Sequence, residues 1–195
     1  MKKLNLILWF CLILPVLMSC ERPSYSDEIR DTYQEAKRNS TSGAVIDDNM
    51  WSAISLYEFD WDEAVSYCEQ LDELGHYDWR LPTVSELRTL IQNCPDTETY
   101  GFCNMTDECL EESVAEGDRS KDTFCYSDDC SCRYLGYNSE QYEEGYYSRL
   151  GDNEPLWSST VTWYSSDAIS VRFDNAAISS EPKSYSYYVR CVRKI

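Results

Sequence analysis

Ten cysteines are the residues of this 195-residue sequence whose chemistry is easiest to interpret. Cys11 and Cys20 lie within or directly after an apolar N-terminal stretch, which leaves eight cysteines in the rest of the chain. In an oxidising compartment an even number of cysteines predicts four disulfides. A zinc site is the alternative, but the spacing of Cys130 and Cys132 differs from C-x-x-C, and His76 is the only histidine. The eight are Cys68, Cys94, Cys103, Cys109, Cys125, Cys130, Cys132 and Cys191.

The presence of a single histidine, His76, also bears on whether the chain could be an enzyme. A serine or cysteine nucleophile needs a neighbouring base, and no second histidine is present to act with a Ser or Cys elsewhere. His76 follows a helical pattern and precedes an aromatic motif, where we expect a structural role. We therefore predict no catalytic residue and no enzymatic activity.

Oxygen ligands suitable for calcium occur in two short segments. Calcium takes about six to eight oxygens from carboxylates, amides and backbone carbonyls. The candidate ligands are Asp152, Glu154, Asp174 and Asn175, and the alternative is a solvated turn and a hairpin tip. A further acidic group either holds a structural calcium or remains a solvated charge run; its members are Glu111, Glu112, Asp118, Asp122, Asp128 and Asp129.

The chain is rich in aromatic residues, with 6 Trp, 16 Tyr and 5 Phe. Trp61, Trp79 and Trp157 are predicted to lie in the core, because aromatic rings bury large apolar areas. Tyrosines are enriched in binding surfaces because they combine a rigid contact area with a hydroxyl group. The candidate ligand-binding residues are therefore Tyr134, Tyr137, Tyr142, Tyr146 and Tyr147.

Two helices are predicted before the cysteine-rich part of the chain. Asp60 and Glu63 have the spacing of a capping box, apolar residues follow at helical intervals, and Gly75 is the expected C-cap. Thr83 and Glu86 form a second capping box. The second helix is expected to bury Leu87, Leu90 and Ile91.

Strands are predicted on both sides of an irregular segment. Residues 49–55 form the first strand, and residues 156–160, 168–173, 176–179 and 185–192 form later ones. Between Cys94 and Cys132 lie eleven acidic residues and only two basic ones, so order there must come from disulfides, bound cations or both. The order of strand, two helices, loop and antiparallel strands predicts an α+β fold.

The N-terminus carries a targeting pattern. Lys2 and Lys3 precede an apolar run, Leu4 to Leu17, whose 14 residues are too few for a bilayer span of about 20. Leu17-Met18-Ser19-Cys20 resembles the bacterial lipobox, so we expect a signal peptide over residues 1–19 and a lipidated Cys20; an ordinary secretory peptide is the alternative. Residues 20–43 form a tether, and residues 44–195 form one domain with an acidic, cysteine-rich insert at about 94–154.

Charge restricts the partners of the mature chain. From Cys20 onward it carries 15 basic and 35 acidic residues, a net charge of −20. Nucleic acid is excluded as a partner, because its affinity depends on cationic contacts to phosphate. Anionic lipid repels the chain as well, so the lipid anchor must hold it on the membrane. Glu21 stands where Asp would mark inner-membrane retention, which favours the outer membrane, facing the periplasm or the cell surface.

Four segments carry a family resemblance. WDEAVSYCEQL at 61–71, YDWRLPTVSEL at 77–87, WSST at 157–160 and YYVRCVR at 187–193 resemble, in this order, the DUF1566 family. It is also called the Lcl C-terminal domain and is similar to the Fibrobacter succinogenes major paralogous domain. The resemblance covers about residues 45–195. It implies a C-type-lectin-like fold with two helices, a twisted antiparallel sheet and a long disulfide-rich loop.

The resemblance also implies roles for particular residues. A bridge from Cys68, on the buried face of the first helix, to Cys191, in the last strand, would join the two ends of the domain. The other six cysteines are then expected to pair among themselves within residues 94–132. Three arginines inside the matched motifs are predicted to form buried pairs with carboxylates that fix the fold, with contact to a ligand as the alternative; they are Arg80, Arg190 and Arg193.

The expected function is that of a surface-tethered, adhesin-like, non-enzymatic binding module. A glycan or protein ligand would contact the loop of residues 95–155, which takes the place of the lectin long loop. One alternative is a structural envelope lipoprotein without a small ligand. A more remote one is an oxidase similar to formylglycine-generating enzymes, which need two free cysteines to hold a metal. No cofactor is expected, with calcium left open.

Replacing the lipidated cysteine tests the anchor. We expect Cys20→Ser to abolish lipidation and to release the protein from membranes, because the thiol is the group that accepts the lipid. Metabolic labelling with a fatty-acid analogue measures the first effect and membrane fractionation the second. Label that persists on the Cys20→Ser variant would contradict the prediction.

Overall fold

The computed structural model describes residues 41–110, 125, 130–132, 145–162 and 166–195. All of them belong to the second of two compact units, Lys37–Ile195. Cys20 and the predicted signal peptide lie outside the described residues. In the described part of the chain, no helix is both long enough and apolar enough to cross a membrane.

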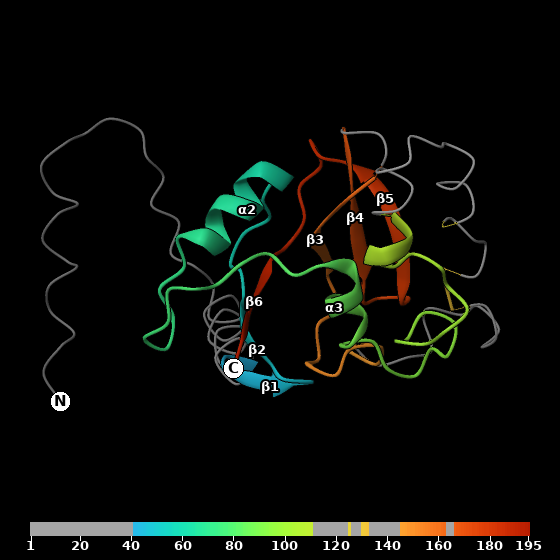
Figure 1. Cartoon of the computed structure of the whole chain (residues 1–195), viewed down its shortest axis with the longest axis horizontal. Helices are drawn as coiled ribbons and strands as arrows, with labels where there is room; N and C mark the ends of the chain where they lie inside the picture. Colours follow the sequence, from blue (N-terminus) through green and yellow to red (C-terminus); the bar gives the residue numbers. More distant parts are fainter. Residues whose placement is uncertain (1–40, 111–124, 126–129, 133–144, 163–165) are drawn as a thin grey trace, which may run out of the picture. The chain divides into compact units, whose positions relative to one another are not determined.

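Two three-stranded antiparallel sheets form the frame of the domain (Figure 1). The first has the order β1-β2-β6, made of Ala44–Ile46, Asn49–Ile54 and Arg190–Lys194. The second has the order β3-β4-β5, made of Pro155–Val161, Asp167–Arg172 and Ala177–Pro182. A parallel bridge between Leu156 and Tyr188 joins them. The arrangement is consistent with the predicted α+β class, but it has two small sheets where a single sheet was expected.

The two predicted capping boxes are present at the starts of the helices. Helix α2 spans Trp61–Glu69, and its N-cap Asp60 accepts a hydrogen bond from the backbone of Glu63, at 2.9 Å. Helix α3 spans Val84–Arg88, and its N-cap Thr83 accepts one from the backbone of Glu86, at 3.3 Å. In both cases the glutamate accepts a return bond from the N-cap backbone. Local sequence signals therefore set both helix starts.

The end of α2 was predicted wrongly. The helix ends at Gln70, not at Gly75. Gly75 lies instead in a tight turn in which Glu73 and His76 exchange backbone hydrogen bonds, with φ of 55° at Leu74 and 76° at Gly75. Two successive positive φ angles are typical of a type I′ turn, for which glycine is as suitable as it is for a helix C-cap.

The last strand begins later than predicted. Residues 185–189 were expected to be part of it, but β6 starts at Arg190. Tyr187 instead exchanges backbone hydrogen bonds with Phe59, and Val189 pairs with Ser55, both on the segment that follows β2. These contacts bring the chain before β6 toward the start of α2.

Two apolar clusters fill the space beside the sheets. Helix α3 packs against β3 and β4, and α2 packs against β3. The smaller cluster contains the buried Trp79 and Trp157, with Trp61 packed partly buried against it, as predicted for the three tryptophans. Trp157 donates its indole N–H to the carbonyl of Phe59, at 2.9 Å, so the polar group of this buried ring has a hydrogen-bond partner.

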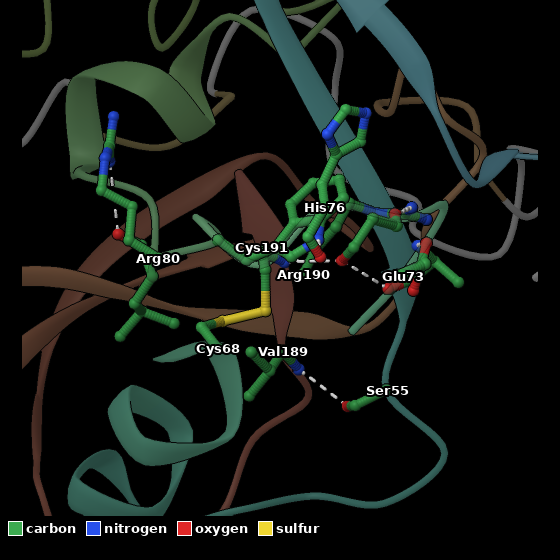
Figure 2. The surroundings of a disulfide bond; sticks show 12 residues. Ser55, Cys68, Glu73, His76, Arg80, Val189, Arg190 and Cys191 are labelled. Atoms are coloured by element: carbon green, nitrogen blue, oxygen red, sulfur yellow. Dashed lines mark hydrogen bonds between the residues drawn. A yellow bond between two sulfur atoms is a disulfide. The ribbon is translucent and has the colours of Figure 1, made fainter. Parts of the chain in front are cut away.

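The disulfide between Cys68 and Cys191 joins α2 to β6 within this cluster (Figure 2). It is the pair that the sequence analysis expected, and both cysteines are fully buried. Beside it the backbone N–H of Val189 donates to the hydroxyl of Ser55, at 2.9 Å. The bridge closes a separation of 123 residues, which the chain-entropy model values at up to about 4–5 kcal/mol.

Arg190 is the most deeply buried charged residue in the described part of the domain. Its side chain is 1% exposed and pairs with that of Asp152, 3% exposed, through Nε–Oδ2 at 3.0 Å and Nη2–Oδ1 at 2.5 Å. It also donates to the backbone carbonyl of Ser52 and to the hydroxyl of Thr41. The two other arginines expected to pair with carboxylates do so at the surface, Arg80 with Glu86 and Arg193 with Asp78.

The buried pair can be tested with Asp152→Asn. The substitution keeps the shape but leaves the charge of Arg190 uncompensated, which should lower the free energy of unfolding by about 3–5 kcal/mol. The matched control is Asp174→Asn, which breaks the half-exposed pair with Arg172 and should cost less than about 1 kcal/mol. Chemical denaturation measures both variants. Equal losses would show that Arg190 does not depend on its carboxylate.

Candidate functional site

The four candidate calcium ligands are all used by the protein itself. Asp152 pairs with Arg190, and both carboxylate oxygens of Asp174 accept from Arg172, at 3.2 and 3.0 Å. Glu154 and Asn175 accept from nearby backbone N–H groups, at 2.9 and 3.1 Å. Among the residues that the structure describes, no group of three or more His, Cys, Asp or Glu side chains could hold a metal ion. The acidic residues from 111 to 129 lie outside the described residues.

The candidate tyrosines that can be placed support the fold. Tyr147 is 6% exposed and lies in the larger cluster, and Tyr146 packs partly buried against it. Their rings meet edge to face, with centroids 5.0 Å apart. Both also accept hydrogen bonds from Gln92 through their carbonyls. Tyr134, Tyr137 and Tyr142 lie outside the described residues.

Among the residues that the structure describes, two strongly exposed aromatics lie in a loop that the sequence analysis did not single out. We call residues 94–103 the aromatic loop. Tyr100 at its tip is fully exposed and Phe102 is 73% exposed, although both are large and apolar. A Tyr-Gly-Phe sequence between two cysteines was the available signal for a turn, because glycine favours tight turns, but the sequence does not show which way the turn faces.

Backbone hydrogen bonds give the aromatic loop a compact structure. The N–H groups of Thr97 and Glu98 both donate to the carbonyl of Cys94, at 3.1 and 3.0 Å. Further along, Gly101 donates to Glu98 at 2.8 Å, and Cys103 donates to Asp96 at 2.9 Å. The side chain of Glu98 accepts from the backbone of Cys94, at 3.1 Å. The loop thus satisfies many of its own backbone groups.

Arg88, in the last turn of α3, binds the backbone of the loop. Its guanidinium is 3% exposed and donates to three backbone carbonyls: those of Thr97 at 3.0 Å, Glu98 at 2.8 Å and Met105 at 3.2 Å. Burial lowers the pKa of Arg88, and the nearby Asp107 and Glu108 act in the opposite direction. The five donors of an arginine are well suited to binding several carbonyls at once, so one buried side chain fixes the loop at Thr97 and Glu98 and the chain just after the loop at Met105.

The tip of the loop has an unusual backbone. Tyr100 has φ of 79° and stands third in the β-turn that Glu98 and Gly101 close, a position where Gly or Asn is favoured. A Cβ at Gly101 would lie 2.5 Å from the carbonyl oxygen of Pro95 and closer still to that of Asp96, so only glycine fits. A bulky residue at positive φ costs about 1–3 kcal/mol and is typical of functional positions.

Disulfides attach the loop and the segment after it to later parts of the chain. Cys103 pairs with Cys130, and Cys109 pairs with Cys125. Both pairs fall within the segment where pairing was expected. The structure differs from the expectation for the last two of the six, since Cys94 and Cys132 are free and buried.

The Lcl C-terminal domain family model matches residues 39–193 of the chain. The match covers both sheets, both helices and the aromatic loop. No curated protein matches the sequence.

A pair of substitutions tests the architecture of the tip. Tyr100→Asn should leave stability unchanged or raise it by up to about 1 kcal/mol, because Asn tolerates positive φ and the exposed ring makes no buried contact. Gly101→Ala should lower stability clearly, because its Cβ meets two carbonyl oxygens. Thermal unfolding of both variants measures the difference. The described turn would be wrong if Tyr100→Asn proved the more damaging of the two.

Proposed function

Because the chain belongs to the Lcl C-terminal domain family, we propose that it is a surface-tethered, non-enzymatic binding module with a C-type-lectin-like fold. Its glycan or protein ligand contacts the aromatic loop. One observation carries this proposal: Tyr100 and Phe102 are displayed to solvent on a loop held by Arg88 and a disulfide. Exposed aromatic residues on a rigid support are typical of the residues that dominate binding energy.

Rigidity is what makes this pair suitable for recognition. A binding loop that must be ordered on contact loses affinity through the conformational entropy it gives up. Here the backbone is already fixed by hydrogen bonds within the loop and from Arg88, so the two rings offer apolar area with only their own side-chain torsions to restrict. The strained φ of Tyr100 is consistent with a side chain retained for contact and not for stability.

Charge narrows the chemical class of the ligand. The mature chain has a net charge of −20, so an anionic glycan or a strongly acidic protein is repelled as it approaches. A neutral glycan or a neutral to basic protein surface fits the aromatic pair and its acidic surroundings. Lipidation at Cys20 and a tether reaching about 25–30 Å would present this loop away from the membrane.

The contacts of His76 support a role other than catalysis. Its backbone exchanges hydrogen bonds with Glu73, and both residues are seen in Figure 2. Its ring lies edge-on to Trp79, with centroids 6.4 Å apart. The carboxylate of Glu73 in turn accepts from the hydroxyl of Ser42 and the backbone of Ala53, at 2.5 and 2.8 Å. The histidine therefore belongs to a turn that joins the end of α2 to the first sheet.

Binding can be tested with the double variant Tyr100→Asn/Phe102→Ser. We expect it to fold normally and to lose binding by about 30-fold or more, since each aromatic anchor contributes at least about 1 kcal/mol. The probes are an array of neutral and charged glycans and a panel of purified envelope and host-surface proteins. Titration of any glycan or protein that binds then measures the loss.

The matched control is Tyr57→Ser, which removes an aromatic side chain of similar exposure, 71%, from the segment after β2. Its binding should equal that of the unchanged protein. If the double variant binds as tightly as this control, the aromatic loop is not the contact surface. If the unchanged protein binds no probe, the structural-lipoprotein alternative replaces the proposal.

A further inference from the structure

Two buried thiols meet at the base of the aromatic loop. Cys94 is fully buried and Cys132 is 5% exposed. The thiol of Cys132 donates to the carbonyl oxygen of Asn93, the residue before Cys94, at 3.9 Å. Disulfides require Cα atoms within about 7 Å, and the bond to Asn93 places Cys132 beside the residue that precedes Cys94.

We propose that Cys94 and Cys132 form a fourth disulfide, which closes the base of the aromatic loop. The inference concerns the covalent structure of the loop and does not depend on the proposed function. The new bridge would stand beside the existing one, since Cys103 already pairs with Cys130. Both ends of the loop would then be bonded to one three-residue segment, 130–132.

The surrounding contacts hold this three-residue segment in place. The carbonyl of Cys130 accepts a hydrogen bond from the backbone of Ile178 in β5, at 3.0 Å. The loop side is fixed by Arg88 and by the bond from Cys103 to Asp96. Hydrogen bonds therefore hold both the loop and residue 130, and the bond from Cys132 to Asn93 brings the two partners to the same place in the fold. It would add a small ring, from Cys94 to Cys103 and back through 130–132, to the loop that the Cys103–Cys130 bridge already closes.

The environment of the pair indicates when the bond forms. Burial, together with the contact to Cys94, raises the pKa of the Cys132 thiol to about 12, so very little thiolate exists in the folded protein at neutral pH. Exchange with a disulfide requires a thiolate, and cysteines in an unfolded chain have a pKa of about 8.5. Oxidation is therefore fast while the chain is folding and slow after the pair is buried.

The reaction is a thiol–disulfide exchange with an external disulfide, either a small-molecule disulfide or an oxidoreductase with a disulfide at its active site. One cysteine attacks the donor as a thiolate and forms a mixed disulfide. The second cysteine, also as a thiolate, displaces the donor sulfur. The product is one new S–S bond in this chain, and the two electrons and two protons end on the donor, which leaves as two thiols.

The test uses the full chain, exported and extracted from membranes in detergent without reductant. The protein is denatured at low pH, labelled with a maleimide and digested. We expect no label on Cys94 or Cys132. Trypsin alone places all six cysteines of the region on two peptides, residues 89–119 and 122–133, so a second cleavage after Glu98 and Glu108 is needed to separate Cys94 from Cys103 and Cys109. The peptide with Cys94 should remain linked to residues 122–133 until reductant is added.

The matched control is Cys132→Ala, in which the peptide containing Cys94 should be released and labelled. A label on both cysteines of the unchanged protein would overturn the proposal, and so would a link from Cys94 that survives in Cys132→Ala. Timing is tested by reducing the folded protein and adding oxidised glutathione with and without denaturant. The Cys94–Cys132 bond should return at least about tenfold faster from the denatured chain, whereas equal rates would contradict the inferred protection by burial.

Discussion

The buried guanidinium of Arg190 is the interaction on which the frame of the domain depends. A charge removed from water is tolerated only when its donors are paired, and the partners of Arg190 come from three separate segments of the chain. Asp152 precedes β3, Ser52 lies in β2, and Thr41 precedes β1. The register of β2 against β6 shifts between Trp51 and Ile54, which turns the Ser52 carbonyl toward the arginine. Cys191 then bonds to α2, so two adjacent residues of β6 fix most of the frame.

The strongly acidic composition gives these arginines particular importance. Six arginines lie in the described residues, and each is engaged: five pair with carboxylates and Arg88 binds three carbonyls. The few arginines are thus used to position the chain. Among the described residues, the remaining acidic side chains have no arginine partner of this kind. The two buried arginines, Arg190 and Arg88, both have their donors satisfied, but by different kinds of partner. Arg190 neutralises a carboxylate, whereas Arg88 orders a loop through neutral backbone groups and keeps its charge compensated at longer range by Asp107 and Glu108.

Sequence reasoning succeeded where the signal was local or periodic. Both capping boxes depend on residues three positions apart, and the pairing of Cys68 with Cys191 follows from a helix face and a strand. It failed at Gly75, because a glycine at positive φ suits a helix C-cap and a type I′ turn equally. It overlooked Tyr100 because the density of tyrosines pointed elsewhere, and because exposure is decided by a turn and a bridge that only tertiary structure reveals.

The structure of the aromatic loop explains how two large apolar side chains can stay exposed to solvent. In a flexible loop the rings would turn inward, because burying apolar surface lowers the free energy. Tyr100 cannot do so by a simple backbone rotation, because Gly101 is packed against two carbonyls and Arg88 holds the carbonyls of Thr97 and Glu98. The exposure of the two rings is therefore set by the contacts that hold the loop and not by the residues at its tip. The identity of the rings at the tip can then change while the buried contacts that set the fold remain as they are.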